Sequence, residues 1–237
     1  MLPRPCAGLA LAAGLALLPA PALAEPGGDP FERFNRAIYG FNAAVQDKVL
    51  VPATRYYVDA VPEAVRSSVS NALSNLREPL TALNSSLQGD LDNAGAATAR
   101  FAINSTFGVL GLFDAATGLG FESRSEDLGQ TLCTHGMPEG AFLVLPLIGP
   151  TTTRDLTGAV VTLAAGTALF GDAFTAFVAT DRTVGSMEVI SDVRHLERSA
   201  LDPYAAQRSA YRQHRRALCS NGDLSVAYMP DDTDTLP

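Results

Sequence analysis

The sequence predicts a mostly helical protein with one irregular, apolar middle segment. Apolar residues recur at spacings of three and four in several segments, which is the period of an amphipathic helix. Short polar residues followed by proline or a carboxylate mark several helix starts. The sequence contains neither a series of evenly spaced strands nor a repeat of about 20–50 residues. These three observations favour the all-α class.

The N-terminus has the pattern of an export signal. Arg4 provides a positive start, residues 7–18 form a short apolar run, and Ala22-Leu23-Ala24 fits a cleavage site. The run is too short to span a bilayer. Because Glu25 rather than cysteine follows the cleavage point, we expect no lipid-anchor attachment there.

The expected domain organisation follows from this signal. We expect a cleaved signal peptide, a single helical domain and a disordered acidic tail, over residues 1–24, 25–222 and 223–237.

Composition and motifs argue against nucleic-acid binding and catalysis. Lys and Arg number 17 against 25 Asp and Glu, so the net charge of −8 disfavours contact with phosphate backbones. Nucleophile elbows, Walker loops, dinucleotide fingerprints and His-Glu-x-x-His are missing from the sequence. His135, His195 and His214 lack metal-ligand spacing. We therefore expect no enzyme activity and no cofactor, and any transport would be passive or driven by partners.

The first mature helix is expected to start at Asp29 as N-cap, with Pro30 in its first turn. One stripe of this helix carries large apolar side chains, namely Phe31, Phe34, Ile38, Phe41 and Val45. Two readings stay open for this stripe. It either packs on a protein core or faces a membrane interface.

The next helix is predicted to start at Val61-Pro62-Glu63 and to be interrupted at Glu78-Pro79. A short successor is expected after the proline. Residues 91–108 are helical in composition and rich in Gly and Ala, which allows close approach between helices.

A third group of helices follows Thr152, which is expected to cap a helix with Asp155 three residues on. Between residues 156 and 179 the one charged side chain is Asp172. Glycines divide this stretch, so we expect two helices around Gly171-Asp172 rather than a transmembrane span.

Residues 181–200 predict an amphipathic helix with Val189, Val193 and Leu196 inside. A last helix begins at Asp202-Pro203. This helix contains the basic stretch of the chain, made of Arg208, Arg212, Arg215 and Arg216. The basic side chains either form a solvated face or attract anionic lipid head groups.

The segment GAFLVLPLIGP, residues 140–150, demands an apolar environment. Exposing its six large apolar side chains to water costs on the order of 10 kcal/mol. Gly136, Pro138 and Gly140 predict a chain reversal, either a loop or a short β-hairpin, that leads into this segment. Pro146 excludes a regular central strand.

Two cysteines, Cys133 and Cys219, remain after signal removal. In an exported chain they form either one disulfide that closes a long loop or two buried thiols.

Five stretches in order resemble the MlaA/VacJ family of Gram-negative phospholipid-transport proteins. They cover most of residues 29–216 and read DPFERFNRAIYGFN, NLREPLTALNSSLQGD, RFAINSTFGVLGLFDAATGLG, EDLGQTLCTHGMPEGAFLVLPLIGPTTTRD and DPYAAQRSAY. The resemblance implies a ring-like helical protein with a central amphipathic channel, in the inner leaflet of the outer membrane beside trimeric porins. It also implies removal of mislocalised phospholipids from the outer leaflet and transfer to a periplasmic carrier.

The resemblance assigns a hinge to the glycine-rich turn at the channel mouth, and the residue pattern adds a membrane-facing helix and polar groups. The lipid-channel and hinge residues would be Gly136, Gly140, Phe142, Pro146 and Gly149. The membrane-facing side chains would be Phe31, Phe34, Ile38 and Phe41. Polar groups for the lipid head group would come from Asn35, Asn42 and Thr151. Two alternatives stay open, a soluble periplasmic lipid-binding protein and a structural protein that stabilises porins.

Overall fold

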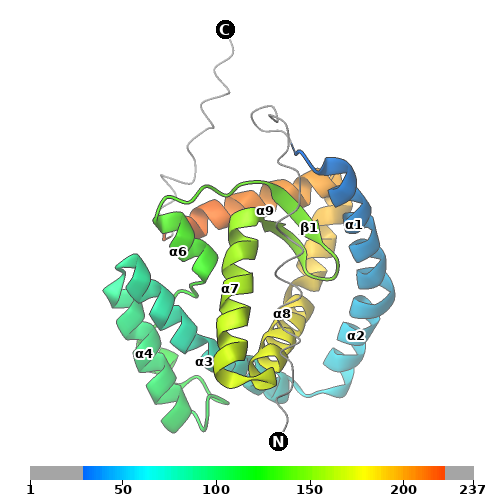
Figure 1. The fold of residues 1–237 in the computed structure, drawn as a ribbon. Coiled ribbons are helices and arrows are strands. Elements are labelled where there is room, and N and C mark those ends of the chain that lie inside the picture. The colour runs from blue at the N-terminus through cyan, green and yellow to red at the C-terminus, as the bar shows by residue number, and fades with distance from the viewer. Residues whose placement is uncertain (1–28, 222–237) are drawn as a thin grey trace, which may run out of the picture. The chain divides into compact units, whose positions relative to one another are not determined.

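The computed structural model describes residues 29–221, so the predicted signal peptide and acidic tail lie outside the described residues. The chain divides after Pro30 into two compact units, and the helices and strands described below belong to the unit that begins at Phe31. Its elements, most of which are labelled in Figure 1, are α1 (Glu32–Val45), η3 (Gln46–Leu50), α2 (Val51–Ala60), α3 (Glu63–Gln88), α4 (Leu91–Thr106), α5 (Ala115–Gly118), α6 (Leu128–Thr134), β1 (Phe142–Leu145), β2 (Gly149–Thr152), α7 (Thr153–Phe170), α8 (Asp172–Ser199) and α9 (Pro203–Cys219).

The predicted all-α class is confirmed, because the only sheet within the described residues is the antiparallel pair β1–β2. Each element contacts the next around a closed circuit of helices and strands. Starting at α1, the neighbours in contact are the β1–β2 hairpin, α7, α6, α3, α8 and α2, and η3 joins α2 back to α1. In Figure 1, α1 and α2 lie on one side of α7 and α4 lies on the other, and α3 crosses between the two sides near the bottom of the view. The helices therefore surround an interior, as a ring-like arrangement requires.

The first helix starts later than predicted. Its N-cap is Phe31 and its first residue is Glu32, so the assignment of Asp29 as N-cap is wrong. The helix continues through a π-helical turn, η3, into α2, where Pro52 lies in the first turn. Since proline has no N–H to donate, a widened turn before it is a common way to continue a helix.

The predicted interruption at Pro79 is also wrong, because α3 runs unbroken through that position. Glu78 and Thr81 on either side are 5% and 2% exposed. Glu78 accepts a 2.8 Å hydrogen bond from Nε of Arg100 on α4. Packing against α4 offsets a cost of about 3 kcal/mol for proline inside a helix.

Other helix boundaries were correctly predicted. Thr152 accepts a hydrogen bond from the Asp155 N–H at 3.3 Å, and Asp202 accepts one from the Ala205 N–H at 3.1 Å. Two helices meet at Gly171, as expected, although the second continues without a break to Ser199. Among the described residues, none of the helices has the length and hydropathy needed to cross a membrane.

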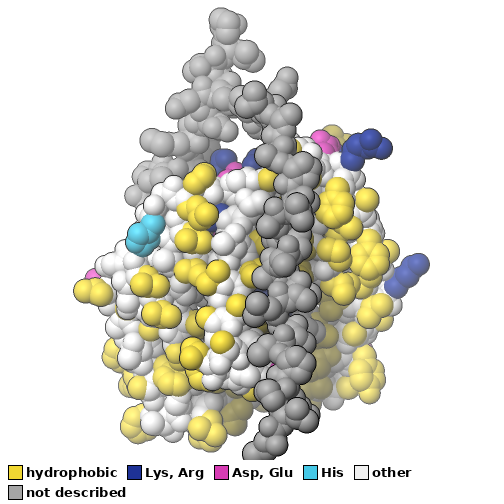
Figure 2. All heavy atoms as spheres, in the orientation of Figure 1, with side chains coloured by type: hydrophobic (Ala, Val, Ile, Leu, Met, Phe, Trp, Pro, Cys, Tyr) yellow, Lys and Arg dark blue, Asp and Glu magenta, His cyan; other side chains and the backbone are white. Residues whose placement is uncertain are grey.

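The interior is mostly polar and many apolar side chains point outward. The apolar core is a small cluster around Phe142, Val144 and Tyr204. Buried polar or charged residues include Asn35, Asn42, Asn75, Glu78, Thr81, Asn84, Ser85, Asn93, Asn104, Gln130, Thr131, Thr152, Arg154, Asp155, Glu197 and Arg215. Figure 2 shows hydrophobic side chains gathered along the edge formed by α1 and α2.

The inverted polarity corrects the predicted orientation of α8. Val189 and Leu196, expected inside, are 52% and 47% exposed, whereas Ile190 and Glu197 are buried. The 3.6-residue period identified the residues that share a face, but the apolar face does not pack on the protein interior.

One disulfide joins Cys133 in α6 to Cys219 at the end of α9, with a Cα–Cα distance of 5.9 Å. The bond closes a loop with a sequence separation of 86 residues. Of the two states left open for these cysteines, the structure contains the disulfide. It ties the last helix to the segment that precedes the hairpin.

Candidate functional site

The apolar segment at residues 140–150 is itself part of a β-hairpin, whereas the predicted reversal at Gly136, Pro138 and Gly140 lies before it. Phe142 pairs with Thr152 and Leu145 with Gly149, and Pro146 lies in the turn between the strands. Pro146 is therefore outside the ladder, where its missing N–H costs nothing. The hairpin is one of the two features that define the candidate site.

Two asparagines of α1 hold the outer edge of β1. The Asn35 side chain donates to the Phe142 carbonyl at 3.0 Å and accepts from the Val144 N–H at 2.9 Å. Asn42, two turns further along, donates to the Leu145 carbonyl at 2.9 Å and accepts from the Leu147 N–H at 2.8 Å. Each side-chain amide makes the two hydrogen bonds that a neighbouring strand would make. The backbone N–H and C=O groups at these positions of the β1 edge are therefore paired.

This pairing changes the role expected for Asn35 and Asn42. Their side-chain amides were expected to offer polar groups to a lipid head group. Instead they are used by the hairpin backbone, and Asn35 is fully buried. Thr151 is buried as well, and its hydroxyl donates to the Thr152 carbonyl at 3.4 Å.

The hairpin has a buried base and an exposed tip. Phe142 is 1% exposed and makes edge-to-face contacts with Tyr204 and Tyr211 of α9. Leu147 and Ile148 in the turn are 72% and 55% exposed. Phe142 and Val144 of the apolar segment are therefore core, Leu143 and Leu145 are half-buried, and only the turn faces outward.

The predicted hinge glycines all have a left-handed backbone. Gly136, Gly140 and Gly149 all have positive φ, at +84°, +69° and +93°. A Cβ at Gly136 or Gly149 would meet nothing within 4 Å, whereas one at Gly140 would collide with the Thr153 hydroxyl at the start of α7. Positive φ disfavours any residue with a side chain, so these positions demand glycine for conformation. Their role as a hinge stays a prediction.

The predicted membrane-facing residues divide by exposure. Phe34 and Phe41 are 52% and 50% exposed, and Phe31 is half-buried. Ile38 packs against the core cluster around Phe142, so its assignment as membrane-facing is wrong. Val49 and Tyr56 continue the line of exposed side chains at spacings of eight and seven residues. The asparagines and the phenylalanines therefore occupy different faces of the same helix, one toward the hairpin and one outward.

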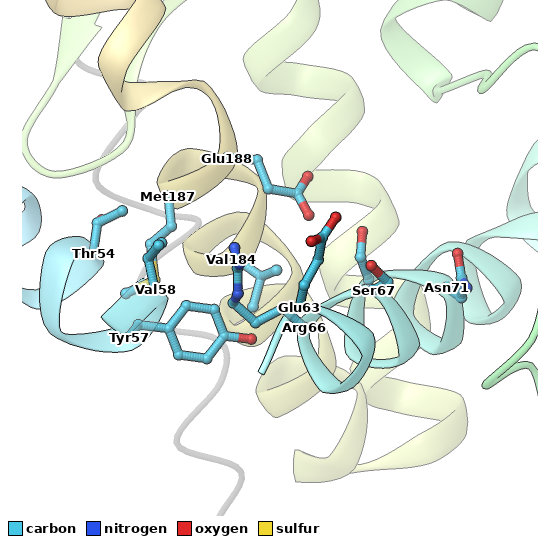
Figure 3. Close-up of a pocket in the computed structure, with 11 residues that line it drawn as sticks. Thr54, Tyr57, Val58, Glu63, Arg66, Ser67, Asn71, Val184, Met187 and Glu188 are labelled. Atoms are coloured by element: carbon cyan, nitrogen blue, oxygen red, sulfur yellow. The ribbon is translucent and has the colours of Figure 1, made fainter. Parts of the chain in front are cut away.

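A cavity of about 340 Å³ is the second feature of the site. It lies between α2, the start of α3 and the middle of α8 (Figure 3). Its walls combine apolar, hydroxyl and charged side chains, from Thr54, Tyr57, Val58, Glu63, Arg66, Ser67, Ser70, Asn71, Val184, Met187 and Glu188. The predicted hinge and channel residues do not line it.

The cavity residues were missed by sequence reasoning, and the local sequence contains little that could have identified them. Glu63 looks like an ordinary acidic residue in a first helical turn, and Arg66 like a solvated one. Glu188 is 125 positions further along the chain, and only the packing of α8 beside α2 and α3 brings it near.

A charge cluster centred on the buried Arg215 joins α9 to α7 and to the start of α6. Arg215 of α9 donates to Asp127 at 2.6 Å and to Asp155 at 2.9 Å, and the Tyr211 hydroxyl donates to Asp155 at 2.8 Å. Burial opposes ionisation of Asp155, but the Arg215 charge and these hydrogen bonds outweigh it and lower its pKa. Burial and the neighbouring Asp155 charge raise the pKa of Tyr211.

This cluster corrects the interpretation of the basic stretch in α9. Arg215 is buried, and Arg212 forms an ion pair with Glu139 at 2.9 Å. Neither side chain belongs to a solvated face or is available to anionic lipid. Gly129 is needed beside the cluster, because a Cβ there would lie 2.7 Å from both Arg215 Nη2 and Asp155 Oδ1.

Comparison with known proteins finds one matching family and several similar chains. Residues 27–218 match the family model described as MlaA lipoprotein. A Rickettsia typhi protein without an assigned function is 34% identical over 80% of this chain and 77% of its own. Proteins called intermembrane phospholipid transport system lipoprotein MlaA are 32% identical in Haemophilus influenzae and in Escherichia coli. They cover 86% of this chain, and 85% and 83% of their own lengths.

A solved structure, described as the structural basis for maintenance of bacterial outer membrane lipid asymmetry, has a similar fold. The TM-score is 0.72 at 28% sequence identity, and the match covers 81% of this chain and 99% of the other.

Proposed function

The chain belongs to the MlaA lipoprotein family, and from this premise we propose that it is a passive phospholipid conduit at the periplasmic side of the outer membrane. It takes mislocalised phospholipids from the outer leaflet and passes them to a periplasmic carrier, which maintains lipid asymmetry. The relatives named for intermembrane phospholipid transport support the substrate class. A trimeric porin and the inner leaflet are the proposed surroundings.

The observation that carries the proposal is the inverted polarity of the helices. Phe34 and Phe41 point away from the hairpin and are half exposed, while Asn35 and Asn42 of the same helix are buried. A water-soluble protein buries its largest apolar stripes. Outward phenylalanines and an inward polar face suit a protein whose outside contacts acyl chains and whose inside must pass a polar head group.

The physical demand on such a conduit is large. Moving a two-tailed lipid through water would expose about 30 methylenes, at roughly 0.8 kcal/mol each. A route without an energy source must therefore keep the tails in contact with apolar surface throughout. Exposed apolar side chains at the hairpin tip, Leu147 and Ile148, and beside the cavity, Val58 and Val65, offer such contact.

A transfer assay with purified components tests the proposal. The chain is reconstituted in vesicles with a labelled phospholipid, and a soluble periplasmic lipid-binding protein serves as acceptor. We expect label to reach the acceptor faster than from protein-free vesicles. Equal rates would overturn the conduit and leave the porin-stabilising protein. Release of the chain into the soluble fraction without detergent would favour the soluble lipid-binding protein.

Replacing Phe34 and Phe41 by serine should weaken membrane association without unfolding the chain. Both side chains are half exposed, so burying the exposed parts in lipid contributes roughly 2 kcal/mol in all, or about 30-fold in partitioning. Sedimentation with phospholipid vesicles measures the change. Ala37→Ser with Ala44→Ser is the matched control, with the same spacing on the same helix at exposed positions. Unchanged sedimentation of the phenylalanine variant would show that this stripe does not meet the membrane.

A further inference from the structure

The cavity between α2, α3 and α8 has the size of a lipid head-group site. Ligand pockets span about 300–1,000 Å³, and a volume of about 340 Å³ is at the low end of that range. Two acyl chains do not fit in such a space, whereas a phosphate with a short polar substituent does. The cavity is therefore suited to the head group while the chains stay on apolar surface.

Two carboxylates converge in this cavity. Figure 3 shows the carboxylates of Glu63 at the start of α3 and Glu188 of α8 pointing toward one another. Like charges at close range repel, so this arrangement favours a cation between them. The Arg66 guanidinium lies beside Glu63 and Tyr57 on the same wall (Figure 3).

The polar groups of the cavity are incompletely used within the described part of the chain. Arg66 donates through Nε to the Val61 carbonyl at 3.2 Å, and its two Nη groups have no ion pair among residues 29–221. In the same described range neither Glu63 nor Glu188 has an opposite charge within ion-pair distance. The Thr54 hydroxyl oxygen is buried without a hydrogen-bond partner. Glu63 and Glu188 are exposed and Arg66 is half-buried, so the Thr54 oxygen is the one of these atoms that is buried. Buried polar groups are normally paired, so this hydroxyl points to a ligand, and the three charged side chains surround it.

We propose that this cavity binds the head group of an amine-bearing zwitterionic phospholipid of the phosphoethanolamine type. The lipid phosphate accepts hydrogen bonds from Arg66 and the Thr54 hydroxyl, and the ammonium lies between Glu63 and Glu188. Val58 and Met187 contact the glycerol region. The inference rests on the proposed function, because it names the lipid that the conduit selects.

Net charge sets the expected selectivity. One arginine and two glutamates leave the cavity with an excess negative charge, so an anionic head group such as phosphoglycerol meets net repulsion. A trimethylated amine has no N–H to donate to the carboxylates and loses charge-assisted hydrogen bonds. We therefore expect phosphatidylethanolamine to bind ahead of phosphatidylcholine, and phosphatidylglycerol last.

A competition experiment tests the preference. The full chain is incubated with vesicles that contain equal amounts of the three phospholipids with identical acyl chains, and the lipid recovered on the purified protein is quantified. We expect phosphatidylethanolamine to exceed phosphatidylglycerol roughly tenfold, the effect of one charge-assisted hydrogen bond. A chelator should leave the ratio unchanged, since an amine rather than a metal ion occupies the site.

Variants identify the groups responsible. Glu63→Gln with Glu188→Gln should abolish the preference for phosphatidylethanolamine, and Arg66→Gln should reduce recovery of all three lipids. Glu122→Gln, an exposed carboxylate on the loop before α6, is the matched control and should keep the wild-type ratio.

Two outcomes would overturn the inference. One is equal recovery of the three lipids by the wild type, and the other is an unchanged ratio in the double glutamine variant. Either result can coexist with transfer to the periplasmic acceptor, so it would leave the conduit standing. A loss of the ratio on adding chelator would assign the carboxylates to a divalent cation and also contradict the proposal.

Discussion

Replacing Arg215 with leucine will lower the free energy of unfolding by about 3–5 kcal/mol, the cost of removing one partner from a buried ion pair. Arg215 is buried and bridges Asp127 before α6 to Asp155 in α7. Without the guanidinium, the Asp155 carboxylate keeps Arg154, at 3.0 Å, as its remaining cation. Denaturant unfolding followed by circular dichroism measures the loss.

The neighbouring residue provides the control for this prediction. Arg216 is exposed, so Arg216→Leu should change stability by less than about 0.5 kcal/mol, as surface substitutions usually do. Equal effects at the two positions would mean that the Arg215 cluster does not hold α9 against α6 and α7.

The same cluster predicts how stability depends on pH. The pKa of Asp155 is lowered in the folded chain, so the unfolded chain binds this proton more readily. The stabilisation is therefore complete above the ordinary aspartate pKa of about 3.9 and is lost as the pH falls below it. We expect the stability difference between wild type and Arg215→Leu to narrow as the pH falls from 6 to 3, by up to about 1.4 kcal/mol for each pH unit below about 3.9. A constant difference over that range would contradict the pairing.

Replacing Asn35 with leucine will detach the base of the hairpin from α1 and cost about 2–5 kcal/mol. The substitution keeps the volume but leaves the Val144 N–H and the Phe142 carbonyl without their 2.9 and 3.0 Å partners. Each unpaired buried group costs about 1–3 kcal/mol. Hydrogen exchange at the Val144 amide will accelerate about tenfold for each 1.4 kcal/mol of lost stability.

Two variants sharpen the test of the hydrogen bonds between Asn35 and the hairpin. Asn35→Asp keeps an acceptor for the Val144 N–H and should retain part of the protection. Asn71→Leu removes a single 3.3 Å bond to the Leu112 carbonyl at an exposed site and should cost less than about 1 kcal/mol. If the Val144 amide exchanged at the wild-type rate in Asn35→Leu, the hairpin would be held by β2 and the aromatic cluster alone.

Local signals accounted for much of the helical framework. Caps at Thr152 and Asp202 depend on one side chain and the next turn, so the sequence contained all the information needed. The proline rule failed at Pro79 because packing of α3 on α4 offsets the local cost. A chain reversal was predicted at Gly136 and Gly140, but the hairpin turns at residues 146–148 and its first strand is the apolar segment itself.

The candidate site was predicted less completely. Exposed Phe34 and Phe41 occupy positions that fit the membrane-facing reading, and their contact with lipid stays a prediction. The head-group cavity depends on Glu63, Arg66 and Glu188, which are brought together from distant segments. No periodicity or spacing connects α8 to the start of α3, so sequence reasoning had no signal for that site.

By itself the sequence determined which residues share a helix face, where most helices begin, and the family to which the chain belongs. Only the tertiary structure decided which face is turned inward. Helical periodicity depends on backbone geometry, which is the same in water and in lipid, whereas the direction of a face depends on what surrounds the helix. Asn35 and Asn42 point inward because β1 offers them an unpaired edge, and the phenylalanines are consequently turned outward.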